Sequence, residues 1–363
     1  MKADKAKIFT VMGMAVGLLL TGCRAPLQDD SRLRVTPGGV LDSPARALDE
    51  VLRLRSSGEV PQNRQIVIEF ACGTYAVDRP LEITEAHGPL LLKGAGPLGT
   101  VFSGGTRLGA FKCELDGLTW RNTIDKTLNF DQLFINDQRA DLSPKPNCFA
   151  PRAPGAWYLD TATHEVVYVA RRGESTFTTI AIAGTVDSIL CLKGASDVAI
   201  EGIAFMHNAL GRDGVSGAMV VSVCSRRISL VDCRFEHGSN YGMKIADSDG
   251  VTVRRSWFED LGSGAVKADG TGRLVVEDNV VANSGRAEGG LAAVVVRGKD
   301  GCKVEHNDFI SLKGQGLKCF GFIQASQNRF WKVPGEADSP REGEAGVKKD
   351  GSAWRARVEL LTF

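Results

Sequence analysis

The sequence predicts an all-β solenoid of short stacked strands, with a capping helix at its N-terminal end and a small β-rich insertion. The main observation is a repeat, in which a short apolar strand is followed at a fixed place by a bulky apolar residue. The strands cover residues 198–200, 228–230, 251–253, 274–276, 302–304 and 322–324, and the bulky residues are Phe205, Phe235, Phe258, Val281, Phe309 and Phe330. The bulky residues are separated by 30, 23, 23, 28 and 21 positions. A period of roughly 20 to 30 residues is typical of solenoids, in which each repeat buries its apolar face only against its neighbours.

Composition is the second observation, and it excludes several other classes. The chain has 363 residues with 42 Gly, 13 Pro, 43% hydrophobic residues and a net charge of +1. These values indicate a globular protein and exclude a disordered or collagen-like chain. Because the net charge is close to zero, there is no general electrostatic attraction to nucleic acid, and no nucleic-acid partner is expected.

The N-terminus has the features of an export signal. Three lysines precede an apolar run over residues 8–20, which is short for a membrane span but suits the central region of a signal peptide. The run ends in Leu-Thr-Gly-Cys at residues 20–23, which resembles the lipobox of bacterial lipoproteins. That resemblance implies cleavage before Cys23 and lipidation of Cys23; the alternative is an ordinary signal peptide with a chance cysteine. We therefore expect an exported protein, lipid-anchored to a bacterial membrane, and Arg24 after the cysteine favours the outer membrane.

Along the chain, changes of pattern predict six segments. A serine and a proline at Ser43 and Pro44 begin a stretch with a helical apolar period to Ser56, which would cap the open end of the solenoid. The regular repeat breaks after about residue 106 and resumes near residue 186. The segments are a signal peptide (1–22), a tether (23–42), the cap with the first rungs (43–105), the β-rich insertion (106–185), the main rungs (186–333) and a polar tail (334–363).

The eight cysteines after Cys23 are scattered through the chain and form no C-x-x-C pair. An exported protein could oxidise them, but several occupy inward positions of apolar strands, which favours buried small hydrophobic residues over disulfides. The spacing of cysteines and of the five histidines matches no zinc motif. No metal and no cofactor are therefore expected, apart from one alternative given below.

Four segments carry a resemblance to a known group. They are Cys72-Gly-Thr-Tyr75, residues 133–140 leading to Pro146-Asn147, Trp157-Tyr-Leu-Asp160, and rungs such as Phe258-Glu-Asp-Leu-Gly262. Over most of residues 35–331 the chain resembles the right-handed parallel β-helix proteins of the pectate-lyase-like superfamily, and it is most similar to bacterial exported proteins related to β-helical glycoside hydrolases, including fucosidase-like and xylosidase-like families. The resemblance implies a right-handed parallel β-helix. It leaves the reaction open, because such β-helices host hydrolases, lyases, esterases and non-enzymatic adhesins.

The chain departs from this group in two ways. The related hydrolases usually carry a further basic residue soon after the Gln-Arg-Ala of residues 138–140, whereas Asp141 follows here. They also continue for many more rungs, whereas the repeat here ends near Trp331. We therefore expect a shortened relative that lacks part of the usual substrate groove.

Strand alternation predicts a basic column on one face of the solenoid. The 23-residue step aligns residues 243–246 with residues 266–269, and alternation turns Lys244, Lys267 and Asp269 outward. On the next strands Arg297 and Lys318 also face out, which gives a column of Lys244, Lys267, Arg297 and Lys318 with Asp269 among them. Such a column suits the successive negative charges of an extended acidic polysaccharide; the alternative is a solvated face that only keeps the sheet soluble.

A second column lies two residues after each bulky residue of the repeat. Its members are His207, His237, Asp260, Asn283, Ser311 and Lys332. His237 beside Asp260 would form a general base oriented by a carboxylate. The alternative is a polar ladder that satisfies the backbone groups of the turns.

Chemistry on this surface would need carboxyl groups. Glycoside hydrolysis uses two of them, and the sequence does not select the pair among Asp247, Asp249, Asp260, Asp269 and Glu288. A polysaccharide lyase would instead use Asp247 and Asp269 to hold Ca²⁺ with Lys267 as base, and it is the only alternative that needs a metal.

The sequence thus predicts a membrane-anchored β-helix that binds and cleaves polysaccharide, with Asp269, Asp260 and His237 as catalytic candidates and the basic column as the substrate site. The alternatives are a non-catalytic binding or surface protein and a lyase. The sequence does not specify the sugar or the oligomeric state.

Overall fold

A computed structural model describes residues 31–335, except residues 129, 144–152, 212–216 and 287–290. The expected signal peptide and lipidated Cys23, the candidate Glu288, Cys148 and the tail from residue 336 lie outside the described residues. No helix within the described part of the chain is long and apolar enough to cross a membrane.

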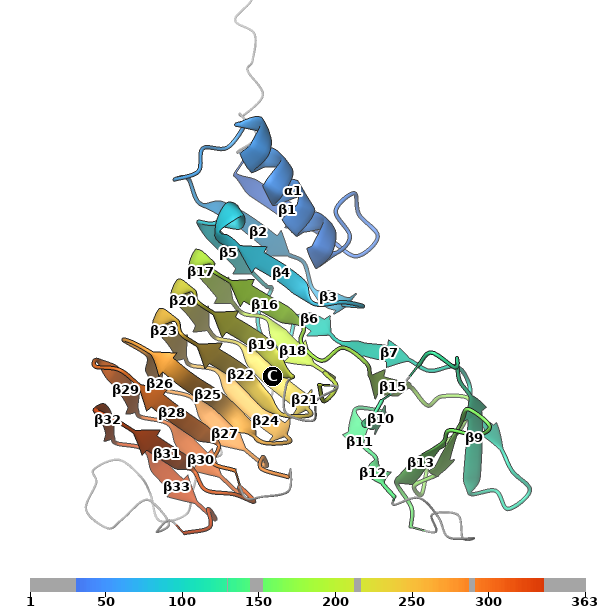
Figure 1. The fold of residues 1–363 in the computed structure, drawn as a ribbon. Coiled ribbons are helices and arrows are strands. Elements are labelled where there is room, and N and C mark those ends of the chain that lie inside the picture. Colours follow the sequence, from blue (N-terminus) through green and yellow to red (C-terminus); the bar gives the residue numbers. More distant parts are fainter. Residues whose placement is uncertain (1–30, 129, 144–152, 212–216, 287–290, 336–363) are drawn as a thin grey trace, which may run out of the picture. The chain divides into compact units, whose positions relative to one another are not determined.

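Three long sheets of parallel strands wind around one apolar core (Figure 1). Sheet A consists of β1 (Arg32–Val35), β2 (Ile66–Phe70), β5 (Leu90–Lys93), β17 (Ser196–Glu201), β20 (Arg226–Val231), β23 (Asp249–Arg254), β26 (Val275–Glu277), β29 (Cys302–Glu305) and β32 (Ile323–Ser326). Sheet B consists of β3 (Gly73–Ala76), β6 (Thr100–Ser103), β18 (Ala204–Met206), β21 (Arg234–Gly238), β24 (Trp257–Leu261), β27 (Val280–Ala282), β30 (Asp308–Ile310) and β33 (Arg329–Trp331). Sheet C consists of β4 (Leu81–Thr84), β16 (Leu190–Lys193), β19 (Ala218–Val223), β22 (Tyr241–Ala246), β25 (Gly264–Thr271), β28 (Val294–Gly298) and β31 (Leu317–Phe320). The expected right-handed parallel β-helix is confirmed.

The bulky residues of the repeat form a continuous ladder inside the β-helix. Phe205, Phe235, Phe258, Val281, Phe309 and Phe330 pair in register along sheet B, as the sequence predicted. The rings of Phe235 and Phe258 stack with centroids 4.6 Å apart, and those of Phe309 and Phe330 stack at 5.1 Å. This ladder fixes the register of the rungs, because a slip by one residue would turn each ring towards solvent.

In the last rung, the sequence-based alignment is wrong by one residue. Cys302 pairs with Ile323 rather than with Phe322, and Phe322 is 86% exposed. The shift arises because Phe322 belongs to the turn that precedes β32. Because Phe322 is apolar, the sequence predicted that its side chain faces the core. The turn geometry places the Ile323 side chain at that position instead.

Helix α1 (Pro44–Ser57) covers the N-terminal end of the stack, as predicted (Figure 1). The Ser43 side chain accepts a hydrogen bond from the Arg46 amide, and Gly58 ends the helix with a left-handed φ of 77°. Its buried face includes Ala47, Leu48, Val51 and Leu54, which join the core of the first rungs. The helix thereby removes the apolar end of the solenoid from water.

The β-rich insertion leaves the β-helix after β6 and returns before β16, so the rungs on either side still stack directly. Its strands are β7 (Gly105–Arg107), β8 (Lys112–Cys113), β9 (Thr119–Thr123), β10 (Leu133–Ile135), β11 (Gln138–Arg139), β12 (Asp141–Leu142), β13 (Ala156–Asp160), β14 (Glu165–Val169) and β15 (Ala181–Gly184). They form two small sheets around a separate core that includes Trp120, Trp157 and Tyr168. A core of its own allows the insertion to act as a rigid wall beside the rungs.

The seven described cysteines form no disulfide with one another. Cys191, Cys233 and Cys302 are buried, as expected for small hydrophobic residues. The same interpretation is wrong for Cys72, Cys113 and Cys224, which are exposed.

Candidate functional site

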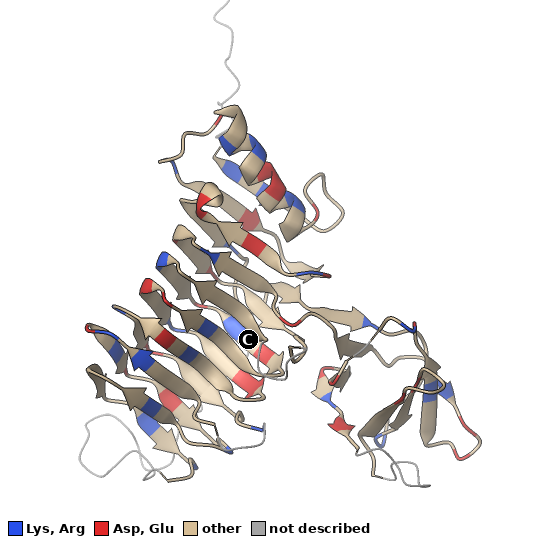
Figure 2. Ribbon diagram, viewed as in Figure 1, with Lys and Arg blue, Asp and Glu red and all other residues tan. Residues whose placement is uncertain are grey.

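The predicted basic residues lie on neighbouring strands of sheet C, and Figure 2 shows several basic positions along these strands. Lys267 and Arg297 are exposed and alternate with buried residues, so their side chains point away from the core. Lys244 on β22 pairs with Lys267 on β25, and Lys267 pairs with Val295 on β28, which in turn pairs with Lys318 on β31. Arg297 pairs with Asp269, as strand alternation predicted, so it lies two positions along the strand from the column of Lys244, Lys267 and Lys318. Arg297 lies in the adjacent column, because the alternation of the strand gives Val295 the place next to Lys267.

The adjacent column contains Asp269, Arg297 and Phe320 in register. The Arg297 guanidinium lies over the Phe320 ring, 4.8 Å from its centroid, and the Lys318 ammonium lies 5.5 Å from the same centroid. An aromatic ring in contact with two cations gives this end of the face both apolar surface and positive charge.

Two hollows line up along this face of sheet C. The smaller, of about 220 Å³, is lined by Lys267, Asp269, Arg297, Lys318 and Phe320, among others. The larger is a cleft of about 860 Å³ between sheet C and the insertion, and its described lining includes Asp131, Arg139, Asp141, Lys244 and Arg286. Tyr241, Lys267 and Leu291 line both hollows. The two hollows therefore form one groove that crosses successive rungs, and we call it the sheet C groove.

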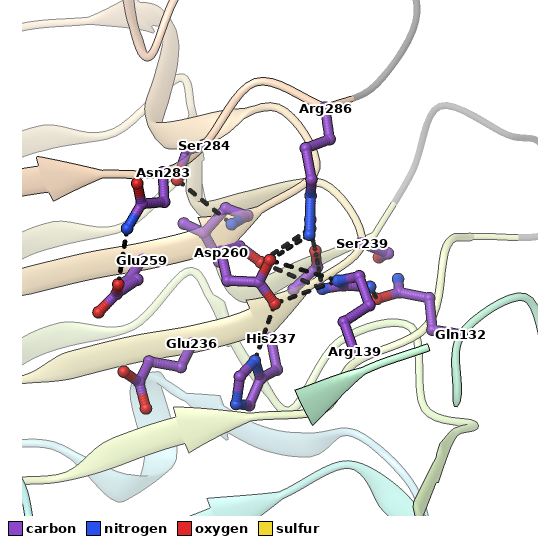
Figure 3. Close-up of polar contacts among 12 residues, drawn as sticks. Gln132, Arg139, Glu236, His237, Ser239, Glu259, Asp260, Asn283, Ser284 and Arg286 are labelled. Atoms are coloured by element: carbon purple, nitrogen blue, oxygen red, sulfur yellow. Dashed lines mark hydrogen bonds and ion pairs between the residues drawn. The ribbon is translucent and has the colours of Figure 1, made fainter. Parts of the chain in front are cut away.

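The insertion is fixed beside the groove by a cluster of charged groups around Asp260 (Figure 3). Arg139 on β11 donates from Nε to Asp260 Oδ2 at 3.1 Å. Arg286, which follows β27, donates from Nη1 to Asp260 Oδ1. Both arginines also donate to the main-chain oxygen of Asp260, at 3.1 Å from Arg139 and 2.9 Å from Arg286. One carboxylate thus joins the insertion to two successive turns of the β-helix.

The two arginines differ in how much of their hydrogen-bonding capacity the cluster uses. A guanidinium has five N–H donors. Arg139 donates from Nε to the Asp260 carboxylate and from Nη1 to the Gln132 side-chain oxygen. Its Nη2 donates to the main-chain oxygens of Gly238 and Asp260. Arg286 donates from Nη1 and Nη2 only, and its Nε has no acceptor among the described residues. Arg139 is therefore nearly saturated, whereas Arg286 retains donors.

His237 contacts Asp260, as the sequence suggested. Its Nδ1 lies 2.8 Å from Asp260 Oδ2, and its ring stacks on His207 with centroids 5.4 Å apart. Phe134 of the insertion covers both rings, at 4.9 Å from His237 and 4.8 Å from His207. However, neither His237 nor Asp260 lines the groove. Their arrangement packs the turns and the insertion together rather than presenting a base to a bound ligand.

All six members of this second column adopt a left-handed backbone conformation. Their φ values lie between 49° and 61°, at His207, His237, Asp260, Asn283, Ser311 and Lys332. Such values mark the same tight turn on each rung and are unusual for residues other than glycine. The column thus has a structural role in the turns, in agreement with the polar-ladder alternative.

Electrostatics also argue against Asp260 as a proton donor. Burial alone would raise the pKa of Asp260, but the hydrogen bond to His237 and the charges of Arg139 and Arg286 bring that pKa below its usual value. Burial lowers the pKa of Arg139 to about 10, so Arg139 stays protonated at neutral pH. The cluster is therefore a charged anchor with a carboxylate that stays ionised.

Of the three catalytic candidates, Asp269 lies apart from the other two. It is exposed at the far end of β25, while Asp260 precedes that strand. Asp269 lines the smaller hollow, whereas Asp260 lies on β24 of sheet B and lines neither hollow. The two carboxyl groups therefore do not face the same part of the groove.

The other carboxylates named from sequence also differ in their surroundings. Asp249 is the first residue of β23 in sheet A, where it pairs with Arg273. Asp247 follows β22, and its amide donates to the Asp269 carbonyl at 3.0 Å, so these two residues lie on adjacent rungs as the lyase alternative required. Neither Asp247 nor Asp249 lines the groove.

Sequence reasoning missed several residues of the groove, among them the charged residues Asp131 and Arg286. Asp131 lines the cleft from the insertion, and burial raises its pKa above the usual value. Arg286 lies in a loop after β27, where no repeat position identifies it. Both residues reach the groove from irregular segments, so strand periodicity gave no signal for either.

One group of possible metal ligands occurs among the described residues, away from the groove. Glu277, Asp278 and His306 have ligand atoms within 4.8 Å of one another. Arg254 already contacts Glu277 at 3.6 Å and Asp278 at 3.4 Å. This guanidinium offsets one of the two negative charges that would attract a metal ion.

Comparison with known proteins supports the fold. Residues 162–309 match the family model for the right-handed β-helix region. A solved structure described as a glycoside hydrolase is 13% identical, covers 83% of this chain and 96% of its own, and has a TM-score of 0.57. A pectin methylesterase in complex with a hexasaccharide is 10% identical, with coverage of 91% and 96% and a TM-score of 0.42. A search of curated protein sequences finds no match. The chain is thus a right-handed parallel β-helix, and identities this low establish the fold alone.

Proposed function

We propose that this protein binds an extended acidic polysaccharide in the sheet C groove. The observation that carries the proposal is the groove itself, which crosses successive rungs and is lined by Lys244, Lys267, Arg297 and Lys318. Because neighbouring strands lie about 4.8 Å apart, the basic groups recur along the path that a polymer would follow. Phe320, whose side chain is 39% exposed in the smaller hollow, adds aromatic surface on which a sugar ring can pack.

The resemblance to a structure described as a glycoside hydrolase supports a carbohydrate as the ligand. The positive lining supports an acidic one, with carboxylate or sulfate groups. We further propose that the protein is exported and held at the outer membrane of a bacterium by lipid on Cys23. The apolar run over residues 8–20 and the Leu-Thr-Gly-Cys sequence support this location.

The binding proposal is tested with the purified domain from residue 31 onward and a panel of acidic and neutral polysaccharides, with affinity measured by calorimetry. Replacing Lys244, Lys267 and Lys318 with serine should weaken binding of acidic polymers and make it less sensitive to salt. A control replaces three lysines outside the groove, Lys93, Lys112 and Lys303, and should leave the affinity unchanged. Equal affinity of the wild type and the groove variant would contradict the proposal.

Glycoside hydrolysis is a second candidate, and Asp131 is the observation that favours it. A carboxyl group that lines the cleft and has a raised pKa can hold a proton for a leaving-group oxygen. New reducing ends, lost in the Asp131→Asn variant, would support hydrolysis. Products with the ultraviolet absorbance of an unsaturated uronic acid would indicate a lyase instead, and binding without any products would contradict both reactions.

A further inference from the structure

Arg286 combines two properties that distinguish it from the other arginine of the cluster. Its side chain lines the cleft and is 21% exposed, so it lies at the boundary between protein and solvent. Its Nε and part of its Nη1 capacity are unused by the described residues, whereas Arg139 uses donors on all three of its nitrogens. A partly buried guanidinium with spare donors can bind an anion more strongly than a fully solvated one.

The cluster holds the Arg286 guanidinium in one orientation. Nη1 is bound to the Asp260 carboxylate and Nη2 to the Asp260 main-chain oxygen at 2.9 Å, as Figure 3 shows. Nη2 also lies 3.5 Å from the Gly238 main-chain oxygen, and Nε takes no part in these contacts. Because the group is fixed before a ligand arrives, little side-chain entropy remains to be lost on binding.

Charges around the cleft favour an anion even after the internal ion pairs are counted. The described lining includes four cationic groups, Arg139, Lys244, Lys267 and Arg286, and two carboxyl groups, Asp131 and Asp141. Asp260, behind the lining, neutralises one further positive charge. Four positive and three negative groups leave an excess of one positive charge, and the raised pKa of Asp131 increases this excess as the pH falls.

We propose that Arg286 and Lys267 form a subsite for one anionic group, a carboxylate or a sulfate ester, of a glycan in the sheet C groove. The proposal rests on the proposed function and adds the place where the charge of the ligand is recognised. Lys267 lines both hollows and has no ion-pair partner among the described residues. Arg286 lines the cleft alone, so Lys267 is the member of the subsite that lies where the cleft and the smaller hollow meet.

The test compares a polyuronate with the same polymer after its carboxyl groups have been reduced to alcohols. Arg286→Gln should lower the affinity for the polyuronate about tenfold or more, since a hydrogen bond between charged groups is lost, and should leave the affinity for the reduced polymer unchanged. Lys267→Gln should act in the same direction, and its position on the exposed sheet face avoids damage to the fold. The control is Arg255→Gln, which removes an exposed arginine that pairs with Asp232 outside the groove.

Three results would overturn the subsite. The first is that a variant loses equal affinity for the polyuronate and for the reduced polymer. The second is that neither Arg286→Gln nor Lys267→Gln changes the affinity for either polymer, and the third is that the Arg255→Gln control loses as much affinity for the polyuronate as the subsite variants do. If Arg286→Gln does not fold, Arg286→Lys keeps the charge without the planar fork and should give an intermediate loss for the polyuronate alone. An unchanged affinity in a folded Arg286→Lys variant, together with an unchanged affinity in Lys267→Gln, would also overturn it.

Failure of the subsite can be told apart from failure of the proposed function. A wild-type protein that binds neither polymer contradicts glycan binding. Inorganic sulfate is then titrated into the wild type and into Lys267→Gln and Arg286→Gln. Weaker sulfate binding in both variants supports an anion subsite for another ligand, whereas equal binding in all three proteins overturns the subsite as well.

Discussion

Arg139 in the insertion donates a hydrogen bond from Nε to Asp260 Oδ2 on the β-helix, 3.1 Å away across 121 positions of sequence. The contact is mostly shielded from solvent, with Arg139 and Asp260 side chains 19% and 22% exposed. It joins a separately folded segment to the rungs, and the same segment provides one wall of the cleft. The shape of the proposed binding site thus depends on this pair.

Asp260→Asn should destabilise the protein strongly, because it leaves Arg139 and Arg286 facing each other without their shared carboxylate. Loss of one partner from a buried ion pair costs about 3 to 5 kcal/mol, and urea unfolding measures this cost. The matched control is Asp232→Asn, which breaks the exposed pair with Arg255 and should cost no more than about 1 kcal/mol. Similar costs for the two variants would show that the cluster is not an anchor.

Stability should fall with acidification between about pH 6.5 and pH 3, and His207 is one cause. Burial and the neighbouring His237 and Arg139 charges lower the pKa of His207 to about 3, and its Nε2 has no hydrogen-bond partner among the described residues. An unfolded histidine has a pKa of about 6.5, so in this window the unfolded chain binds one more proton than the folded chain. The free energy of unfolding then decreases by up to about 1.4 kcal/mol per pH unit from this group.

The variant that tests this prediction is His207→Asn, because asparagine tolerates the left-handed φ of 61° and does not titrate. Its unfolding free energy should depend less on pH between 6.5 and 3 than that of the wild type. The lowered pKa of Asp260 adds a separate loss at more acidic pH, because its stabilising effect is present above the unfolded pKa of about 3.9 and disappears as pH falls through the folded value. Parallel pH profiles for the two proteins would contradict the role of His207.

Phe258→Ala should lower the free energy of unfolding by about 3 to 5 kcal/mol, because it removes a fully buried ring from the ladder that sets the register. Thermal unfolding monitored by circular dichroism would detect the loss. Phe177→Ala is the control, since Phe177 is 97% exposed in the insertion and should change stability little. A small effect at Phe258 would mean that the ladder does not stabilise the rungs.

Phe320→Ala should weaken glycan binding without lowering stability. The ring is 39% exposed in the smaller hollow and holds Arg297 and Lys318 over its face. The substitution removes the ring face on which a sugar would pack, and loss of a ligand contact of about 1 kcal/mol corresponds to a roughly fivefold lower affinity, measured by calorimetry. Phe322→Ala, two residues away and 86% exposed outside the lining, should leave the affinity unchanged. Equal effects of the two substitutions would exclude a specific role for Phe320.

The repeat of bulky residues predicted the core correctly because the ladder is a local property of each rung. Phe235 and Phe258 stack as expected, since the step of 23 residues between them brings equivalent positions of two rungs together. The start of the capping helix was predicted from Ser43 and Pro44 for a similar reason, because a helix cap depends on residues that are adjacent in the sequence. The error at Phe322 occurred where a turn, which has no period, decided the register.

The candidate site was predicted only in part. The face of Lys244, Lys267 and Lys318 followed from strand alternation, and so did the contact of His237 with Asp260. The separation of Asp269 from Asp260 did not follow, because columns on different sheets cannot be related without the path of the turns. Asp131 and Arg286 come from irregular segments that carry no repeat.

By itself, therefore, the sequence determined the β-helix, its ladder and the basic face, since each depends on spacing along one strand or one rung. Only the tertiary structure decided that Arg139 crosses from the insertion to Asp260, that this carboxylate is an anchor with a lowered pKa, and that Arg286 faces a cleft. The physical reason is that burial and charge pairing depend on segments far apart in sequence. The packing of the insertion against the rungs, which no local pattern encodes, brings those segments together.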